Sequence, residues 1–220
     1  MEYRISPEEL IDITMPLEAC TPVWPGDVKF CKETRAFGAF RTSKLTMSSH
    51  CGTHIDPPAH LSRHSTFVDD IPMNRLILPA VVVDCGDMRE IDKAHIDNIS
   101  LDGKAMILKT VTAKSGNPSS SMEYSYLCAN AAELAVERGV KTVGIDTFSV
   151  DPPDSTPVHE ILLGASIPIL ENLLLDSVLP GNYLLICFPL KVRAGDGAPV
   201  RAFLQPDKFS KSHEDEWRER

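Results

Sequence analysis

Four short apolar runs, each rich in β-branched residues, constrain the fold of this chain more than any other feature. They lie at 78–85, 105–109, 141–146 and 183–190. Because these runs lack the alternating polar positions of a half-exposed strand, we expect several of them to be strands buried on both faces of a sheet. Between them, 121–138 carries apolar residues at helical spacing and precedes Gly139, a residue typical of helix ends, and a second helix is predicted at 92–98. This order predicts a mixed α/β fold with a mixed sheet and leaves the strand order open.

The length and composition are those of one globular domain. With 220 residues, of which 43% are hydrophobic and 24% charged, the chain can bury a substantial core. We therefore predict a single domain over 1–220. The serine-rich stretch 115–121 is expected to be a loop, and 211–220, which is charged and almost free of apolar residues, a flexible tail.

The charge and hydropathy of the chain exclude several classes of partner. The formal net charge is −9 and no cluster of Lys and Arg occurs, so a nucleic-acid partner is not expected. The longest apolar run, 77–83, is far shorter than the ~20 residues that cross a bilayer, and the N-terminus lacks the apolar core of a signal peptide. We therefore expect a cytoplasmic protein without a membrane partner. The six cysteines form no Cys-x-x-Cys pair and are expected to be reduced thiols, with Cys85 and Cys187 buried in apolar runs.

One segment concentrates the chemically active residues. Three histidines and an aspartate occur within eleven residues, in the order His50-Cys51-Gly52-Thr53-His54-Ile55-Asp56-Pro57-Pro58-Ala59-His60. Glycine, β-branched residues and a proline pair make a helix through this segment implausible. We predict instead an extended strand through 46–56, whose period of two places His50, Gly52, His54 and Asp56 on one face.

Two imidazoles and a carboxylate on one face form a ligand set suited to Zn²⁺ or Mn²⁺. Gly52 would leave a hollow in which a cation could sit between His50 and His54. The two prolines must end the strand, so His60 should stand just past a bend, where it overlooks the metal without binding it. A single His-x3-His pair arises by chance in many proteins, but four such groups together favour a metal site.

The remaining ligands must come from later in the chain, because a catalytic metal needs more than one strand's side chains. His159 lies in a turn-rich loop that follows the predicted strand ending at Asp146, and Glu171 is a charge among apolar residues. The pattern alone leaves the roles of both residues open. His95 and His213 lie in polar contexts and are expected to be solvated.

The segment resembles the H-x-G-T-H-x-D-x-P-x-H signature of the metal-dependent cyclase-like hydrolases, to which bacterial kynurenine formamidases belong. All of its fixed positions are present, from His50 to His60. The resemblance extends over most of the chain, through the stretches at 21–27, 143–147, 189–190 and 198–202.

This resemblance implies a fold of the swivelling β/β/α (cyclase-like) type and a site with two Zn²⁺ ions. His50 and His54 would bind the first ion and His159 the second, while Asp56 and Glu171 would bridge the two. Mn²⁺ remains a possible metal.

The resemblance also implies roles outside the metal ligands. His60 would act as proton donor and acceptor. Trp24 would form a wall for an aryl substrate, although a tryptophan at this place could equally pack in the core or at a subunit contact. Relatives with this fold assemble as homodimers or homotetramers, and we expect the same here.

The expected reaction is hydrolysis of N-formyl-L-kynurenine to kynurenine and formate through a metal-bound hydroxide, because Zn²⁺ lowers the pKa of bound water to roughly 7. One alternative is an isatin-type or other cyclic-amide or acyl hydrolase with a single Mn²⁺ and an amide residue in place of the bridging glutamate, against which Glu171 argues. Another is a non-catalytic metal-binding assembly protein. A serine hydrolase is disfavoured because no G-x-S-x-G motif occurs.

Overall fold

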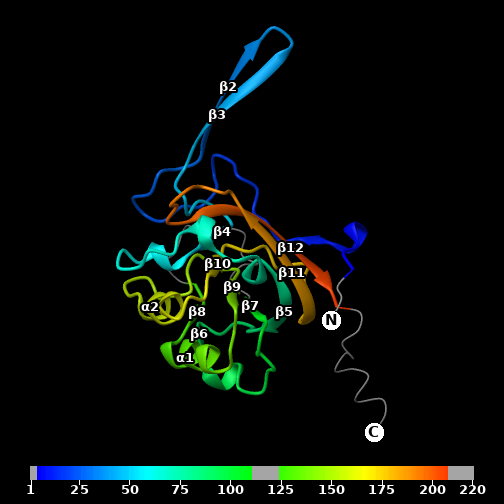
Figure 1. Ribbon diagram of the computed structural model, residues 1–220, viewed down its shortest axis with the longest axis vertical. Coiled ribbons are helices and arrows are strands. Elements are labelled where there is room, and N and C mark those ends of the chain that lie inside the picture. Colours follow the sequence, from blue (N-terminus) through cyan, green and yellow to red (C-terminus); the bar gives the residue numbers. More distant parts are fainter. Residues whose placement is uncertain (1–3, 111–123, 208–220) are drawn as a thin grey trace.

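The computed structural model describes residues 4–110 and 124–207. The loop predicted at 115–121, the tail predicted at 211–220 and the first residues of the helix predicted at 121–138 lie outside these ranges. The described part consists of a closed barrel with helices on one side and a long hairpin that projects from it (Figure 1).

The barrel is built from an eight-stranded mixed sheet in the order β1-β12-β11-β5-β7-β9-β10-β4. Its strands are β1 (Ile11–Asp12), β4 (His54–Asp56), β5 (Ile77–Asp84), β7 (Ala105–Lys109), β9 (Thr142–Ile145), β10 (Ile169–Glu171), β11 (Gly181–Pro189) and β12 (Ala198–Pro206). β12 also pairs with β4, so seven of these strands close into a ring and β1 extends it on the outside. The four predicted apolar strands correspond to β5, β7, β9 and β11, which confirms the mixed α/β class.

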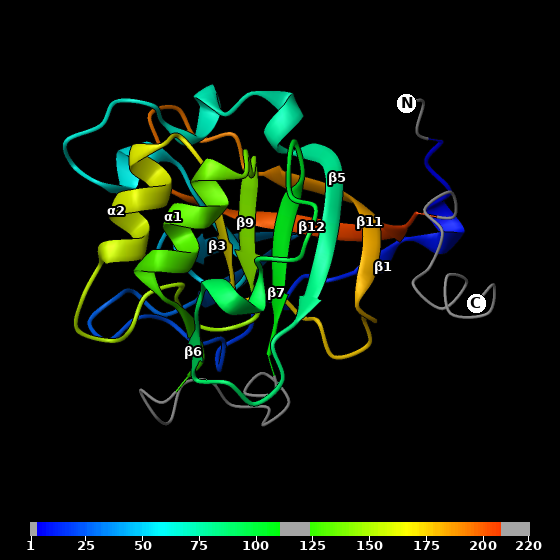
Figure 2. The same cartoon turned by 90° about the horizontal axis from the view of Figure 1, so that it is seen from below.

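Strands β5, β7, β9 and β10 run parallel to one another, and the remaining pairs of the sheet are antiparallel. In β7, Ala105 and Ile107 point into the barrel, while Met106 and Leu108 point outward to a second core. That second core is covered by α1 (Ala129–Glu137) and α2 (Pro157–Gly164), which lie side by side against the sheet (Figure 2). Burial on both faces, as predicted, explains why these strands are uniformly apolar.

Two helix predictions need correction. The helix expected at 121–138 begins only at Ala129, because Tyr126 and Leu127 form β8 (Tyr126–Leu127), which pairs with β6 (Glu90–Ile91). The helix expected at 92–98 is a single 3-10 turn, η5 (Lys93–His95). There the side chains of Asp92 and His95 bond to the backbone amides of Ala94 and Asp92, which closes one turn locally and stops it from propagating.

The other short elements are 3-10 turns: η1 (Pro7–Glu9), η2 (Pro58–His60), η3 (Val68–Asp70) and η4 (Met73–Arg75). All six cysteines are free, and Cys85 and Cys187 are buried as predicted. No helix within the described ranges is both long and apolar enough to cross a membrane.

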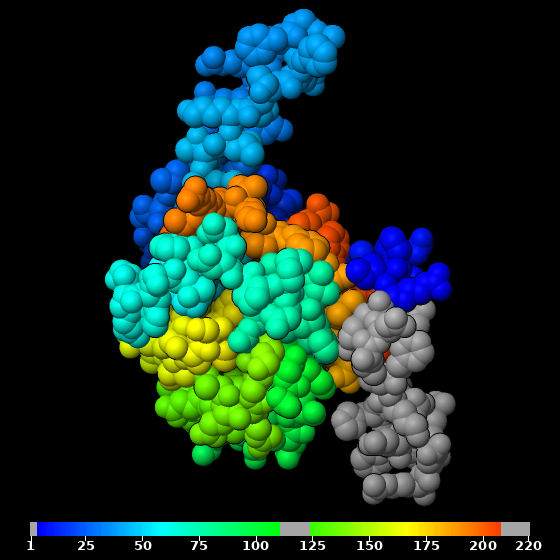
Figure 3. Space-filling model, viewed as in Figure 1, coloured from blue at the N-terminus to red at the C-terminus, as the bar shows by residue number. Residues whose placement is uncertain are grey.

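A β-hairpin stands away from the body. It consists of β2 (Cys31–Phe37) and β3 (Phe40–Thr46), paired over seven positions from Cys31–Thr46 to Phe37–Phe40. We call residues 31–46 the arm. Figure 3 shows it projecting into solvent above the rest of the molecule. The sequence analysis did not predict it.

Candidate metal centre

The metal-ligand candidates gather on the outer face of the barrel, where β4 and β10 lie side by side. These strands pair antiparallel, with Glu171 opposite His54. Ile55 and Leu170 point into the barrel core, so His54, Asp56 and Glu171 point the other way. All three are buried. Register in the sheet therefore places an imidazole and two carboxylates together.

The prediction of one extended strand through 46–56 is wrong. The strand β4 begins only at His54, because Gly52 adopts a left-handed conformation with φ of +66° and turns the chain. The left-handed conformation favours glycine, and a Cβ at Gly52 would lie 2.9 Å from Leu17 Cδ2, so that this side chain would have to shift. Gly52 thus provides a turn that folds His50 back over β4, rather than a hollow in a strand.

His159 comes from α2 and not from a loop. It lies in the first turn of this helix and is buried. The carboxylate of Asp151 holds it: Oδ2 accepts bonds from the His159 amide (2.9 Å) and from Nδ1 of the ring (2.6 Å), while Oδ1 accepts from the Val158 amide (2.7 Å). The ring therefore presents Nε2 to the two buried carboxylates, which is the form that a metal ligand needs.

Asp56 and Glu171 each face histidines on two sides. Asp56 Oδ1 lies 3.5 Å from His54 Nε2, and its Oδ2 lies 3.6 Å from His159 Nε2. Glu171 repeats the arrangement, with Oε2 3.5 Å from His54 Nε2 and Oε1 3.5 Å from His159 Nε2. His50 joins the first side, with Nδ1 2.7 Å from Asp56 Oδ1.

These distances fit shared cations. Two ligands of one tetrahedral Zn²⁺ stand about 3.3 Å apart when each bond is about 2.0 Å long. The separations between His54 or His159 and the carboxylates are close to this value, and too long for hydrogen bonds. Asp56 is fully buried, yet its Oδ2 has no hydrogen-bond partner within the described residues. A buried carboxylate oxygen left in this state points to a cation as its natural partner.

The pKa shifts of Asp56 and His159 indicate that this cluster attracts positive charge. Burial raises the pKa of Asp56, but the neighbouring His54, His159 and His50 outweigh it and bring the pKa well below its usual value. Conversely, burial lowers the pKa of His159, while Asp151, Asp56 and Glu171 raise it well above its ordinary value. The acids thus create a negative site at which positive charge is favoured, whether carried by protons or by a metal.

His60 stands at the edge of this cluster. It ends the turn η2 just beyond the two prolines, with its ring centroid 4.2 Å from that of His50 and 5.6 Å from that of His159. No carboxylate within the described residues forms an ion pair with it. Its partial burial lowers the pKa, which keeps the imidazole neutral and able to accept a proton. The bend predicted after the strand therefore places His60 over the site.

A cavity of about 670 Å³ opens onto these residues. One wall carries Trp24 and Phe148, whose ring centroids are 5.8 Å apart. Trp24 is 36% exposed, so it lies in the pocket wall rather than in the core. Acidic side chains occur at the rim, whereas no Lys or Arg lines the described cavity. The acidic rim residues are Asp27, Asp154 and Asp196.

Sequence reasoning missed several residues that support the ligands. Asp196 Oδ2 lies 3.1 Å from His50 Nε2, and a Cβ on Gly197 would lie only 2.5 Å from His50 Cε1. Asn172 donates to the Gly52 carbonyl, which also accepts from His54 Nδ1 at 2.8 Å. None of these residues had a sequence signal for its role, and Asp151 lies six positions before Pro157, outside the N-cap position that Thr156 occupies.

The other histidines lie elsewhere. His95 pairs with Asp92 at the surface turn η5, His64 does not line the cavity, and His213 lies outside the described residues. The structure thus brings together His50, His54, Asp56, His60, His159, Glu171 and Trp24 around one cavity.

Comparisons with known proteins identify the family to which the chain belongs. The model of the family described as putative cyclase matches residues 11–152. A kynurenine formamidase of Bacillus cereus (strain ZK / E33L) is 36% identical over 205 residues, covering 90% of this chain and 98% of the relative. A kynurenine formamidase of Bacillus anthracis is 36% identical over 203 residues, covering 89% and 97%.

Solved structures share the fold. A predicted metal-dependent hydrolase from Bacillus stearothermophilus has a TM-score of 0.78 at 28% identity and covers 89% of this chain and 97% of its own. An isatin hydrolase bound to thioisatinate has a TM-score of 0.80 at 22% identity, with coverage of 91% and 93%, and this likeness concerns the fold alone. The family model matches most of the chain, and the relatives are 36% identical over nearly their full length. The chain therefore belongs to the cyclase family of metal-dependent hydrolases.

Proposed function

We propose that the chain hydrolyses N-formyl-L-kynurenine to kynurenine and formate at a pair of Zn²⁺ ions. The observation that carries this proposal is that Asp56 and Glu171 each turn one oxygen to His54 and the other to His159. Two carboxylates arranged in this way suit two cations, because each ion then has its own imidazole and shares the negative charge. The substrate is suggested by relatives named kynurenine formamidase.

In this proposal His50 and His54 would hold the first ion and His159 the second, and Asp56 and Glu171 would be ligands shared by both. Mn²⁺ is the alternative metal for the same ligands. The bound ions supply a water of lowered pKa and polarise the formyl carbonyl.

The protein's own side chains orient the substrate and move the proton. The aryl ring of the substrate stacks against Trp24 and Phe148, and the cavity of about 670 Å³ has the size of an ordinary small-molecule site. A C–O bond to the attacking water forms and the C–N bond breaks. Neutral His60 accepts the proton of the water and delivers it to the departing aryl nitrogen, so that the products are an aniline and formate.

The test uses one metal-loaded preparation with N-formylkynurenine, formanilide and isatin as substrates. Turnover of the two formamides is expected to exceed that of isatin. His60→Ala should lower kcat by about 100-fold or more while the metal content stays unchanged. His64→Ala is the matched control, because this histidine lies four positions away and does not line the cavity.

Two results would contradict the proposal. A strong preference for isatin would assign the chain to the other hydrolase chemistry found in this fold. A preparation with full metal content that hydrolyses no amide or ester would make it a metal-binding protein without catalytic activity.

A further inference from the structure

The innermost metal-ligand candidates lie away from solvent. His54, Asp56, His159 and Glu171 are all buried. Taking a divalent cation out of water is costly unless protein groups replace the water around it. A metal centre of this kind therefore needs an entry path, along which protein ligands replace bound water in steps.

A group of three possible ligands lies at the mouth of the cavity. His50, His60 and Asp196 each offer one ligand atom, and these three atoms lie within 4.8 Å of one another. Asp196 Oδ2 lies 3.1 Å from His50 Nε2, and the rings of His50 and His60 have centroids 4.2 Å apart. His60 and Asp196 both reach solvent. We call these three residues the outer triad.

Two further groups of ligands share the histidines of the outer triad. His50 forms one group with His54 and Asp56, and His60 forms the other with Asp56 and His159. In each group the three ligand atoms again lie within 4.8 Å of one another. We call these two groups the inner triads. The outer triad therefore has one histidine in common with each inner triad.

The two nitrogens of the His50 ring face different triads. Nδ1 lies 2.7 Å from Asp56 Oδ1, in an inner triad, whereas Nε2 lies 3.1 Å from Asp196 Oδ2, in the outer triad. A neutral imidazole carries a hydrogen on one nitrogen and can bind a cation through the other. In either state the N–H of His50 has a carboxylate to accept it. The ring can therefore hold a cation at the mouth or in the interior, but not at both places at once.

The charges at the mouth attract cations. Asp27, Asp154 and Asp196 line the cavity there, and no Lys or Arg lines the described cavity. A cleft lined by carboxylates raises the local concentration of cations. Attraction alone would not distinguish the three acids, but within the described residues only Asp196 among them belongs to a triad.

We propose that the outer triad is an entry site for divalent metal ions, and that each ion passes inward through His50 or His60. An incoming ion exchanges part of its water for Asp196 and the two imidazoles. One imidazole then stays bound while the ion moves to the inner triad that contains it. The path through His50 leads to the ligands proposed for the first ion, and the path through His60 leads to those proposed for the second.

The direction of transfer follows from burial. The outer triad has one carboxylate, Asp196, whose side chain is 61% exposed. The interior has two, Asp56 and Glu171, which are buried. A buried carboxylate attracts a cation more strongly than an exposed one, because water and salt screen it less. Equilibrium therefore favours the interior, and the outer triad is occupied only during loading and release. This inference rests on the metal centre of the proposed function but not on its substrate.

The experiment measures Zn²⁺ exchange by the full-length protein in stopped flow, with a chromophoric zinc chelator as the reporter. Uptake is followed with metal-free protein, and release is followed after mixing the loaded protein with excess chelator. His60→Ala should slow uptake about tenfold or more, since on-rates at charged clefts vary over this range. Release should slow by the same factor, because an entry path lowers the barrier in both directions. The final zinc content and the affinity of His60→Ala should therefore stay unchanged.

Asp196→Asn tests the carboxylate of the outer triad. This variant keeps the size of the side chain and removes its charge, and uptake should again slow about tenfold or more. Asp154→Asn is the control for charge, because Asp154 lines the same cavity but belongs to no triad within the described residues. It should slow uptake by no more than about twofold, since exposed charges are screened at physiological salt.

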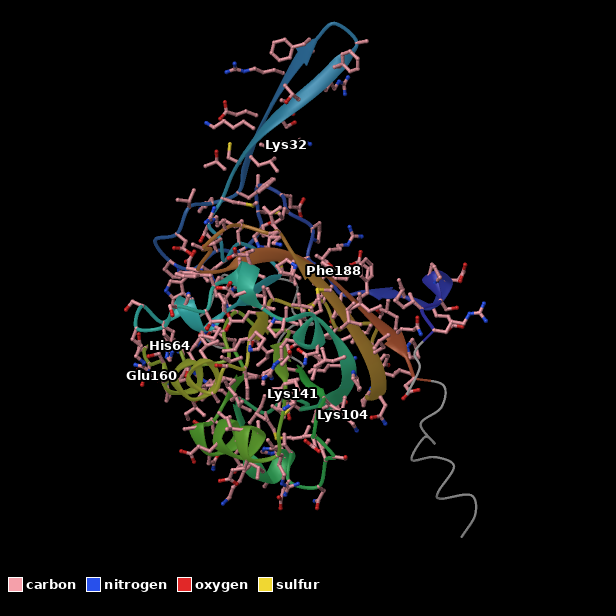
Figure 4. The ribbon with its side chains drawn as sticks, in the orientation of Figure 1. Lys32, His64, Lys104, Lys141, Glu160 and Phe188 are labelled. Carbon is pink, nitrogen blue, oxygen red and sulfur yellow. The ribbon has the colours of Figure 1, made fainter. Side chains whose placement is uncertain are left out.

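His64→Ala and Glu160→Gln are controls for a histidine and an acid outside the cavity. Figure 4 shows both residues at the edge of the body, and neither lines the cavity. Both variants should take up and release zinc at the rates of the unaltered chain. Circular dichroism verifies that every variant is folded.

Three outcomes overturn the proposal. They are unaltered exchange rates in both His60→Ala and Asp196→Asn, an equal slowing in Asp154→Asn, and a loss of affinity without slower exchange in His60→Ala. The second outcome would show general attraction by charge, and the third would make His60 a ligand of the loaded centre. A chain that binds no zinc at all would instead refute the metal centre of the proposed function, so the two failures can be told apart.

Discussion

The carboxylate of Asp151 binds His159 twice, through the ring Nδ1 at 2.6 Å and through the backbone amide at 2.9 Å. The same carboxylate also accepts from the Val158 amide at the start of α2. Asp151 therefore fixes the position of the helix and the orientation of the ring in one contact. Side chains that hold a metal-binding histidine in this way set its tautomer and its basicity.

We expect Asp151→Ala to weaken metal binding by about 10- to 100-fold, since loss of such a partner has this effect on metal sites. It should also cost about 1 to 2 kcal/mol of stability through the lost helix cap. Competition with a fluorescent chelator measures the first effect and urea denaturation the second. Asp92→Ala is the control, because Asp92 likewise caps a turn and pairs with a histidine, His95. An equal loss of metal affinity in the control would remove the special role of Asp151.

Gly197 packs directly against the ring of His50. A Cβ at this position would lie 2.5 Å from His50 Cε1 and 2.9 Å from Nε2, so Gly197→Ala must displace the ring. We expect a loss of activity of at least about tenfold, because displacements of about 1 Å in an active site are that costly. Gly164→Ala should keep full activity, since no atom lies within 4 Å of its added Cβ. Unchanged turnover and metal content in Gly197→Ala would show that His50 can move without consequence.

Asp146 is a buried acid that directly follows β9 and contacts Thr110, the residue after β7. It accepts from the Thr110 amide at 2.8 Å and from the Thr110 hydroxyl at 2.9 Å, and burial raises its pKa from 3.8 to about 7. In the unfolded chain the carboxyl loses its proton near pH 4, whereas in the folded chain it keeps the proton up to about pH 7. Relative to higher pH, the protonated Asp146 carboxyl therefore stabilises the folded chain below pH 4. This stabilisation is lost as the pH rises from about 4 to about 7.

Over this window Asp146 lowers the free energy of unfolding by about 1.4 kcal/mol per pH unit at most. Asp146→Asn should remove this slope. The free energy of unfolding of the variant, minus that of the unaltered chain, should therefore be larger at pH 7 than at pH 4. Urea denaturation of both proteins at pH 4 to 8 gives the difference curve. Asp102→Asn, at an exposed position, is the control. A flat difference curve for Asp146→Asn would contradict the prediction.

The rim of the cavity should select substrates by charge. Asp27, Asp154 and Asp196 lie there and no Lys or Arg lines the described cavity, so an anionic substituent on the aryl ring has no partner. If the proposed function holds, kcat/KM should be highest for N-formylkynuramine, which is cationic, lower for N-formylkynurenine and lowest for N-formylanthranilate.

Asp154→Asn should narrow this preference by about two- to fivefold, and added salt should narrow it further because the rim is exposed. N-formylanthranilate as the best substrate would refute the charge selection alone. Failure of all three formamides would refute the proposed reaction itself, so the two ideas can be told apart.

The sequence by itself determined which strands are buried and which residue types could bind a metal. Strand burial depends on local composition, so the run at 105–109 matched β7 residue for residue. The ligand row was identified from residue types, but its geometry was only half right. A period of two holds from His54 to Asp56, where β4 is a strand, and fails at Gly52, whose turn no pattern of polarity reveals.

Only the tertiary structure decided how the barrel closes and what supports the ligands. Closure depends on the pairing of β12 with β4, and His50 meets Asp196 across 146 positions of sequence. Such contacts form because folding brings distant backbone segments to within a few ångströms, and neither partner carries a local signal of the other. The arm shows the same limit, since the sequence analysis did not predict it and its projection from the body is seen only in the structure.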